Sequence, residues 1–206
     1  PNNNAILVEL GLFHYSNGDY QQAISYFEVL AQQAPNNYIA HLNISACHYL
    51  LGDTEQAIFS AKKSLKIQPN ADGFANLGTY YFILKDFNKA VNAYEQMIIL
   101  NGSDYIKWGN LADAYRFANN PKYTETFQQA IELAEKAFEL NSNNKNAIAS
   151  LAYYYANIGN VEKTYLYAKR IDQKDTGADN FLIAAAYARL KIKLAALNYL
   201  KYAIAN

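Results

Sequence analysis

Cysteine, proline, tryptophan and net charge are all scarce in this 206-residue sequence. Cys47 is the single cysteine, so no disulfide can form within the chain. This excludes a small exported domain held together by disulfides, and a reducing cytoplasm is the expected localisation. Lys and Arg total 18, as do Asp and Glu, which leaves a formal net charge of zero. Proteins that contact nucleic-acid phosphates need a basic surface, so nucleic acid is not an expected partner.

The sequence also lacks a membrane segment and the patterns typical of catalytic sites. No stretch reaches the ~18 apolar residues that a membrane span requires, so no membrane insertion is expected. His41 and His48 lie seven residues apart, with Cys47 beside the second and no carboxylate to complete a tetrahedral metal set. No phosphate-binding glycine loop and no nucleophile, base and orienting residue occur together. We therefore expect no enzyme activity, no catalytic residue, no metal and no cofactor.

One pattern of about 34 residues recurs along the whole chain, as expected for stacked helical hairpins. Its second half reads "SNGDYQQAISYFEVL", then "LGDTEQAIFSAKKSL", then "LKDFNKAVNAYEQMI". Overlaying these segments predicts a single array whose six units cover residues 4–37, 38–70, 71–104, 105–144, 145–176 and 177–206.

Each unit has the pattern of two helices joined by a short turn. Glycines in the polar break, Gly18, Gly52 and Gly159, can supply the positive φ that ends a helix. Apolar residues follow at the helical spacing i, i+3, i+4 and i+7, and no alternating strand pattern appears. Small residues occupy two places where the helices approach one another. These are Gly11, Ser45, Gly78, Ala112, Ala152 and Ala184 in the first helices, and Ala23, Ala57, Ala90, Ala130, Thr164 and Ala196 in the second.

The fourth unit contains an insertion of about six residues in "ANNPKYTETFQQA". Asn120 as helix cap and Pro121 at the first helical position predict an early start of its second helix. That helix would overhang its neighbours by roughly one and a half turns. The overhang is either a neutral length variation or a protrusion that docks a partner.

These residues resemble the tetratricopeptide-repeat family over essentially the whole chain. Unit four has Trp108, Leu111, Ala112 and Tyr115 at family positions, and unit one has Leu10, Gly11, Gly18, Ala23, Phe27 and Pro35. The resemblance implies an all-α, right-handed α-solenoid of about six antiparallel hairpins, with twelve helices and a concave groove lined by the first helices. The stretch from Asp113 to Asn141 is loosely similar to repeats attached to bacterial signalling proteins such as serine/threonine kinases.

The sequence departs from the family pattern in two ways. Gly102 and Ser142 replace closing prolines, and unit six has no polar helix after it to cap the stack. Pro1 also lies three residues before the first unit, as Pro35 lies three residues before Tyr38. We therefore expect the chain to be a fragment of a longer protein, with at least one more repeat upstream.

The sixth position of the first helices presents asparagines in three consecutive units. In this family such asparagines can bind the backbone of an extended peptide, which makes Asn43, Asn76 and Asn110 candidate peptide-binding residues. The other units have Glu9, Ser150 and Leu182 there. The competing interpretation is that asparagine, abundant throughout the chain, caps or hydrates neighbouring helices.

Apolar and charged residues flank this row. Leu12, Tyr15, Tyr49 and Phe82 form side-chain pockets or, alternatively, pack between repeats. Asp113 and Arg116 are candidates for recognising the charge of a ligand. The family's clamp for a C-terminal carboxylate uses basic residues where this chain has Val8, Asp72 and Asn76, so such a clamp is not expected.

These observations favour a non-enzymatic scaffold that binds a protein or peptide partner in its groove. The alternative is a regulatory or self-associating arm of a larger signalling enzyme or transcription regulator. End-to-end self-association is left open by the apolar residues of the last helix, Leu194, Leu197, Leu200 and Ile204.

Overall fold

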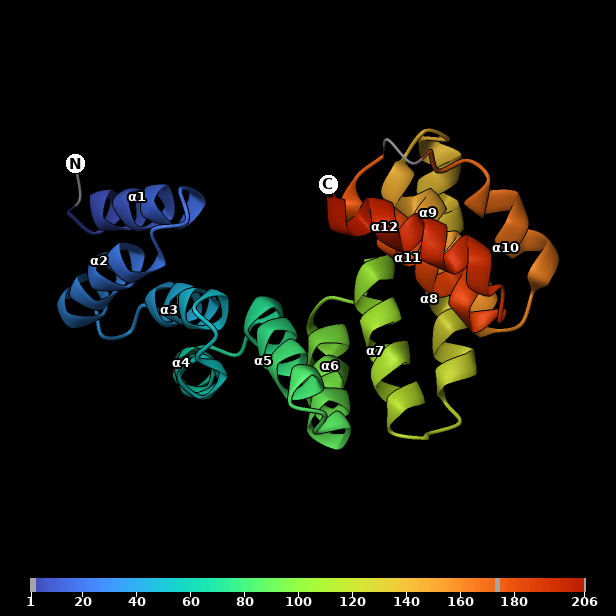
Figure 1. Ribbon diagram of the computed structural model, residues 1–206. Helices are drawn as coiled ribbons and strands as arrows, with labels where there is room; N and C mark the ends of the chain where they lie inside the picture. The colour runs from blue at the N-terminus through green and yellow to red at the C-terminus, as the bar shows by residue number, and fades with distance from the viewer. Residues whose placement is uncertain (1–2, 173–174, 206) are drawn as a thin grey trace. The chain divides into compact units, whose positions relative to one another are not determined.

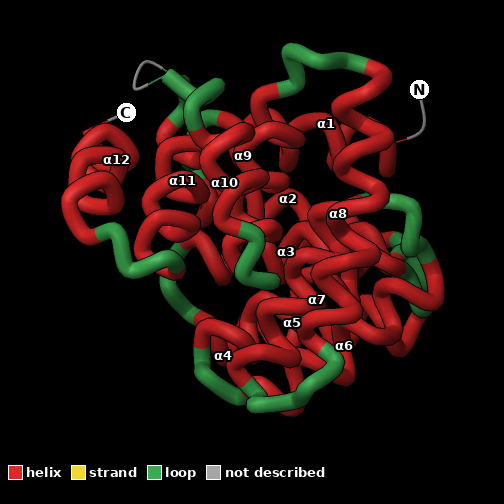
Figure 2. Tube along the Cα trace, turned by 90° about the vertical axis from the view of Figure 1, so that its right-hand side faces the viewer, coloured by secondary structure: helices red, strands yellow, loops and turns green. Residues whose placement is uncertain are grey.

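The computed structural model describes residues 3–172 and 175–205, and every regular element within these ranges is an α-helix (Figure 1). Short loops join consecutive helices over residues 3–168 (Figure 2). The twelve helices of the described chain are α1 (Asn3–Ser16), α2 (Tyr20–Gln33), α3 (Tyr38–Leu50), α4 (Thr54–Ile67), α5 (Ala71–Ile83), α6 (Phe87–Leu100), α7 (Tyr105–Phe117), α8 (Tyr123–Leu140), α9 (Lys145–Asn157), α10 (Val161–Ala168), α11 (Gly177–Arg189) and α12 (Lys193–Ala205). The predicted all-α helical-repeat fold is confirmed.

The helices group into two compact units, each with its own contacts. Unit 1, Pro1–Asn101, holds α1 to α6, and unit 2, Gly102–Asn206, holds α7 to α12. In unit 1, α1 packs on α2, α3 on α4 and α5 on α6, while α2–α3 and α4–α5 join one hairpin to the next. In unit 2, α7–α8, α9–α10 and α11–α12 form hairpins, and α8 packs on α9. A single array through all six hairpins stays a prediction.

Side-chain caps fix where the first helices begin. Asn37 Oδ1 accepts a hydrogen bond from the backbone N–H of Ile39 at 3.0 Å, and Asn70 Oδ1 accepts one from Gly73 at 2.7 Å. Such a cap satisfies an N–H group that the helix itself leaves without a partner. From the second hairpin on, the first helices begin at the residues that start the predicted units: Tyr38, Ala71, Tyr105, Lys145 and Gly177.

The turn inside each hairpin contains one residue in the left-handed region. Gly18, Gly52 and Gly159 have φ values of 81°, 83° and 80°, as the sequence predicts. The other three hairpins place Lys85, Asn119 and Lys191 there, with φ values of 60°, 55° and 62°. A side chain in this region costs about 1–2 kcal/mol, so these three turns form against a local backbone preference.

The small residues of the first helices let the second helix approach closely. A Cβ atom added to Gly78 would lie 2.5 Å from Tyr94 Cε1, and one added to Gly11 would lie 2.5 Å from Phe27 Cε1. Both rings are buried, at 3% and 0% exposure. The absence of a side chain at these glycines therefore makes room for an aromatic ring of the partner helix.

The second helix of the fourth unit starts early, as expected, but at Tyr123 and not at Pro121. It begins seven residues before Ala130, whereas α2 begins three residues before the equivalent Ala23. Asn120 Oδ1 accepts a hydrogen bond from Lys122 N at 3.1 Å, and the Asn120 carbonyl accepts one from Tyr123 N at 3.2 Å. These bonds hold the segment in a turn, so α8 begins at Tyr123 with Lys122 as its N-cap residue. At 18 residues, α8 is still four residues longer than the 14-residue α6, which is about one helical turn.

One second helix of unit 2 is unusually short, and the packing changes around it. Helix α10 has 8 residues, and α11 packs directly on α9. Helix α9 is consequently buried around most of its circumference, from Ala147 to Ala152 without interruption. It forms the centre of a core cluster that also includes Phe127, Ile131 and Ile183.

Cys47 lies in the core of unit 1, with Ile24, Phe27, Leu30 and Ile44. Its side chain is fully buried, and burial raises the pKa of the thiol to about 11. A reactive cysteine needs its thiolate form, so this residue has the environment of a structural cysteine. Within the described residues, no helix combines the length and the apolar character needed to cross a membrane.

We expect Gly78→Ala to destabilise the protein by about 1–3 kcal/mol, because its Cβ overpacks the contact with the Tyr94 ring. Chemical denaturation followed by circular dichroism measures this. Tyr94→Leu in the same chain should recover part of the loss, and Asn92→Ala on the exposed side of α6 should change little. Intrinsic helix propensity alone favours Ala over Gly by about 1 kcal/mol, so a stabilised Gly78→Ala variant would contradict the close-approach argument.

We expect the Cys47 thiol to react slowly with a thiol reagent in the native protein at pH 8, because almost no thiolate forms below a pKa of about 11. The rate should rise as the pH approaches this value while the fold persists. The same protein unfolded in urea provides the control and should react at once. Equal rates in native and unfolded protein would show that Cys47 is accessible.

Candidate functional site

The three predicted asparagines lie in the interior of first helices, away from the capping positions. Asn43 in α3 and Asn76 in α5 belong to unit 1 and are half-buried, and Asn110 in α7 belongs to unit 2 and is exposed. Within the described part of the chain, none of the three amides has a hydrogen-bond partner. Capping is performed by other asparagines: Asn37, Asn70, Asn144 and Asn160.

In unit 2 the first helices share one cavity of about 240 Å³. Asn110, Ser150 and Leu182, the sixth-position residues of α7, α9 and α11, all line it. Equivalent positions of three successive hairpins therefore face one space. Asp113, another predicted site residue, also lines this cavity.

Asp113 and Arg116 bind each other within α7. Asp113 Oδ1 accepts hydrogen bonds from Arg116 Nη2 at 2.8 Å and from the Tyr153 hydroxyl at 2.7 Å. Burial raises the pKa of Asp113, although the hydrogen bonds from Arg116 and Tyr153 and the charge of Arg189 act against this. Burial, and then the Asp113 charge, raise the pKa of Tyr153. The predicted pair of charged residues thus forms a partly neutralised group at the edge of the cavity.

Tyr154 forms another wall of the cavity, against α7. Its hydroxyl donates to the Tyr105 carbonyl at 3.2 Å, and its ring lies against Gly109, where any side chain would collide with it. Burial raises the pKa of Tyr154, and the charges of Asp113 and Asp104 raise it further. The cavity is therefore held in shape by contacts between α7 and α9.

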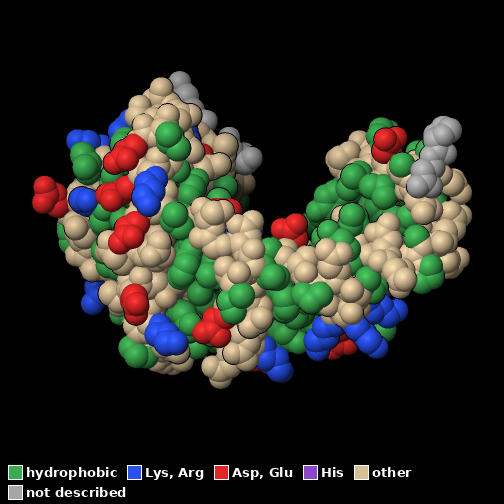
Figure 3. All heavy atoms as spheres, turned by 180° about the vertical axis from the view of Figure 1, so that it is seen from behind, with side chains coloured by type: hydrophobic (Ala, Val, Ile, Leu, Met, Phe, Trp, Pro, Cys, Tyr) green, Lys and Arg blue, Asp and Glu red, His purple; other side chains and the backbone are tan. Residues whose placement is uncertain are grey.

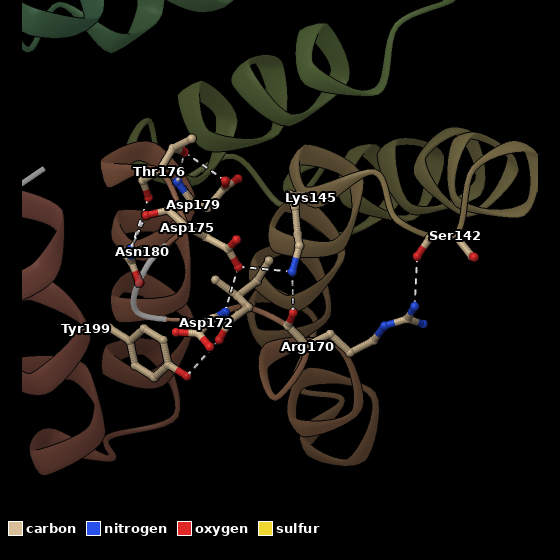
Figure 4. A network of polar contacts seen from close by, with 10 residues as sticks. Ser142, Lys145, Arg170, Asp172, Asp175, Thr176, Asp179, Asn180 and Tyr199 are labelled. Carbon is tan, nitrogen blue, oxygen red and sulfur yellow. Dashed lines mark hydrogen bonds and ion pairs between the residues drawn. The ribbon is translucent and has the colours of Figure 1, made fainter.

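Asp179 in α11 is a cavity residue that the sequence analysis did not select. Its side chain is 2% exposed, and its Oδ2 accepts a hydrogen bond from the Thr176 hydroxyl at 2.7 Å. The Thr176 oxygen in turn accepts from Asp179 N at 3.2 Å, which caps the helix. Figure 4 shows the two side chains pointing toward one another. Asp179 Oδ1 has no partner within the described residues.

A sequence signal for Asp179 existed, because three of the five equivalent first-helix positions are small, although the first and fourth units have Ile6 and Lys107 there. The third residue of the second, third and fifth units is Ala40, Gly73 and Ala147, and all three are buried. A carboxylate at a position that elsewhere packs in the core is unusual and costly unless it has a partner. Burial raises the pKa of Tyr105, and the charges of Asp104 and Asp179 raise it further.

The predicted apolar residues of unit 1 contact different neighbours. Leu12 is exposed, whereas Tyr15 packs against the core that contains Phe27 and meets the Tyr20 ring at 5.6 Å. Tyr49 stacks on Tyr80 at 5.1 Å. Phe82 meets Phe87 edge-on at 5.4 Å.

A cavity of about 460 Å³ in unit 1 is lined by residues of α2, α3 and α4, and neither Asn43 nor Asn76 is among them. His41 and His48 line it together with Lys63. Burial lowers the pKa of His41, and the charge of Lys63 lowers it further. Among the described residues, no three or more His, Cys, Asp or Glu side chains are placed to hold a metal ion.

Charged side chains of both signs share the surface of unit 2. In the view of Figure 3, basic and acidic groups are interspersed over the face of unit 2, which lies on the left. Some of these side chains form ion pairs, including Lys163 with Glu135 at 3.0 Å and Lys145 with Asp175 at 3.1 Å.

Comparison with known proteins identifies repeats in the N-terminal half and a related fold over the whole chain. Two family models described as tetratricopeptide repeat match residues 14–77 and 71–103. The Hsp70-Hsp90 organizing protein 3 of Arabidopsis thaliana is 31% identical over 89 residues, which cover 43% of this chain and 16% of that protein. The chain thus spans a small part of this relative's length.

Solved structures extend the similarity to the remaining helices. PilW, a type IV pilus biogenesis factor, is 19% identical with a TM-score of 0.69, covering 100% of this chain and 94% of that one. The first tetratricopeptide repeat of Spaghetti (RPAP3), bound to the HSP90 peptide SRMEEVD, is 17% identical with a TM-score of 0.54, covering 57% and 94%. At these identities the similarity shows the fold alone. Residues 14–103 therefore carry tetratricopeptide repeats, and the described helices that follow share a fold with solved helical-repeat proteins.

Proposed function

We propose that this chain is a non-enzymatic interaction module that binds an extended segment of a partner protein on the faces formed by its first helices. The observation that carries the proposal is the shared cavity of Asn110, Ser150 and Leu182. It is supported by Asn43 and Asn76, which take the same helical position in unit 1.

The chemistry of the free amides suits recognition of a peptide backbone. Each amide can donate and accept, as can each peptide group of an extended segment. Asn43, Asn76 and Asn110 need not break an internal hydrogen bond before they bind, because none has a partner in the described chain. Recognition through the backbone tolerates different ligand side chains, so any selectivity comes from neighbouring cavities.

We do not expect the bound segment to be a C-terminal tail that is held through its terminal carboxylate. Val8, Asp72 and Asn76 stand where a carboxylate clamp would place basic side chains. The cavity of unit 2 likewise presents Asp113 and Asp179 rather than free cations.

A peptide array tests the amide row. We expect Asn76→Ala or Asn110→Ala to weaken the peptides that bind the wild type by roughly threefold to tenfold, since a net hydrogen bond contributes about 0.5–1.5 kcal/mol. Titration calorimetry of the strongest peptides measures the change. Asn92→Ala, the same substitution on the second helix α6, serves as the matched control. Unchanged binding in both test variants would disprove the backbone-binding role.

A second candidate function, a self-associating arm, is favoured by the two ends of the hairpin series. At the step from α2 to α3, Ile24 and Ile44 are buried in one core cluster. Leu197 in α12 takes the place of Ile24 but is 56% exposed, and Leu10 in α1 takes the place of Ile44 but is 37% exposed. The last and first helices thus leave uncovered the two faces that pack together inside the chain.

A second copy of this chain would cover both faces, and a further repeat of a longer chain is the competing occupant of either one. Helix α12 of one copy would lie against α1 of the next, as α2 lies against α3 within one chain. Such a head-to-tail contact does not close on itself and can continue to further copies.

Light scattering across a concentration series tests this contact. We expect the average mass to rise with concentration, and Leu197→Glu to hold the protein as a monomer, because a carboxylate would have to be buried in an apolar contact. Leu140→Glu, on an exposed residue of α8, is the control and should leave the mass unchanged. A wild type that stays monomeric at every concentration would remove this candidate.

A further inference from the structure

The cavity between α7, α9 and α11 combines negative charge with hydrogen-bond acceptors. Asp113 and Asp179 supply carboxylates, and Asn110 and Ser150 supply neutral oxygen acceptors. Arg116 and the charge of Arg189 partly neutralise Asp113, whereas no ion pair within the described residues involves Asp179. Arg116 bonds to Asp113, and Lys145 pairs with Asp175 at 3.1 Å and donates to the Arg170 carbonyl at 2.9 Å.

Asp179 has one buried carboxylate oxygen without a hydrogen-bond partner in the described chain. Figure 4 shows the Lys145 ammonium turned to Asp175 and the Arg170 carbonyl, while Asp179 faces Thr176. The capping contact with Thr176 uses only Oδ2 and leaves the buried Oδ1 without a partner in the described chain. A buried carboxylate with an unfilled acceptor site is costly, and an incoming cation would remove that cost.

The size of the cavity limits what can enter it. Its volume of about 240 Å³ lies below the roughly 300–1,000 Å³ typical of drug-sized ligands, and it suits one amino-acid side chain. Ile106, Ala178 and Leu182 provide apolar wall, and Tyr153 and Tyr154 provide aromatic wall. A lysine side chain matches this combination, with an apolar stem and an ammonium group that donates three hydrogen bonds.

We propose that this cavity is a specificity pocket for one lysine side chain of the bound partner segment, with Asp179 as its counter-charge. The inference rests on the proposed function, because Asn110 beside the pocket would hold the backbone of the segment that carries the lysine. It adds the requirement that the bound segment carries a lysine, which backbone recognition by the asparagines does not impose.

The test uses the full chain and peptides recovered from the array, each prepared with lysine, norleucine or acetyl-lysine at every lysine position. We expect one lysine position at which either replacement weakens binding by roughly tenfold or more, because a charge-assisted hydrogen bond is lost. Asp179→Asn, which keeps an acceptor for Thr176, should bind the lysine and norleucine peptides equally. Glu162→Gln, an exposed residue of α10 with the same charge change, is the matched control and should retain the preference for lysine.

The possible results separate this inference from the proposed function. Wild-type protein that binds norleucine peptides as tightly as lysine peptides would overturn the pocket while leaving peptide binding intact. A peptide with arginine at that position binding as tightly as lysine would overturn the assignment to lysine. Binding of no peptide at all would overturn the proposed function and this inference with it.

Thermal unfolding separates a binding role of Asp179 from a purely structural one. Asp179→Asn should keep or raise the melting temperature, because a buried unpaired charge is removed. A lower melting temperature with unchanged lysine preference would show that Asp179 only supports the Thr176 cap of α11. Should this variant fail to fold, Leu182→Phe, which fills the cavity from another helix, is expected to abolish the lysine preference as well, and a retained preference would overturn the proposal.

Discussion

Close approach of the two helices in a hairpin is the constraint from which the other contacts follow. The side of the first helix that faces its partner carries a glycine or another small residue, and an aromatic ring of the second helix fills the space at Gly11 and Gly78. Rings of this size dominate burial in small cores, so the packing within each hairpin relies on its own residues more than on the neighbouring hairpin. The opposite side of each first helix is then free to vary, and it carries Asn43, Asn76 and Asn110.

Local patterns explain why the helices could be predicted. Apolar spacing, capping residues and turn glycines act within a few residues, and the starts at Tyr38 and Ala71 follow from them. The predicted first residue of α8 is two residues too early, because Pro121 and Lys122 form a turn before the helix begins at Tyr123. The turns at Lys85 and Lys191 were harder to place, since neither residue favours the left-handed region.

The candidate site was only partly predictable, because its residues meet through packing between hairpins. Asn110 and Asp113 follow from repeat position and helical spacing, and the structure places both in one cavity. Sequence spacing could not show that Arg116 and Tyr153 would occupy Asp113 Oδ1, since Tyr153 lies in another hairpin. Asp179 required a comparison with Ala40 and Ala147, its buried counterparts in other units.

The short α10 changes how unit 2 should lose its structure. In an ideal hairpin stack each repeat touches only its neighbours, so end repeats can unfold while the others persist. Helix α9 packs on its own partner α10, on α8 of the hairpin before and on α11 of the hairpin after, and its residues are buried on nearly all sides. Melting of any one of these helices would expose α9. Because α9 packs on α11 far more extensively than α3 packs on α5, unit 2 should unfold more cooperatively than unit 1.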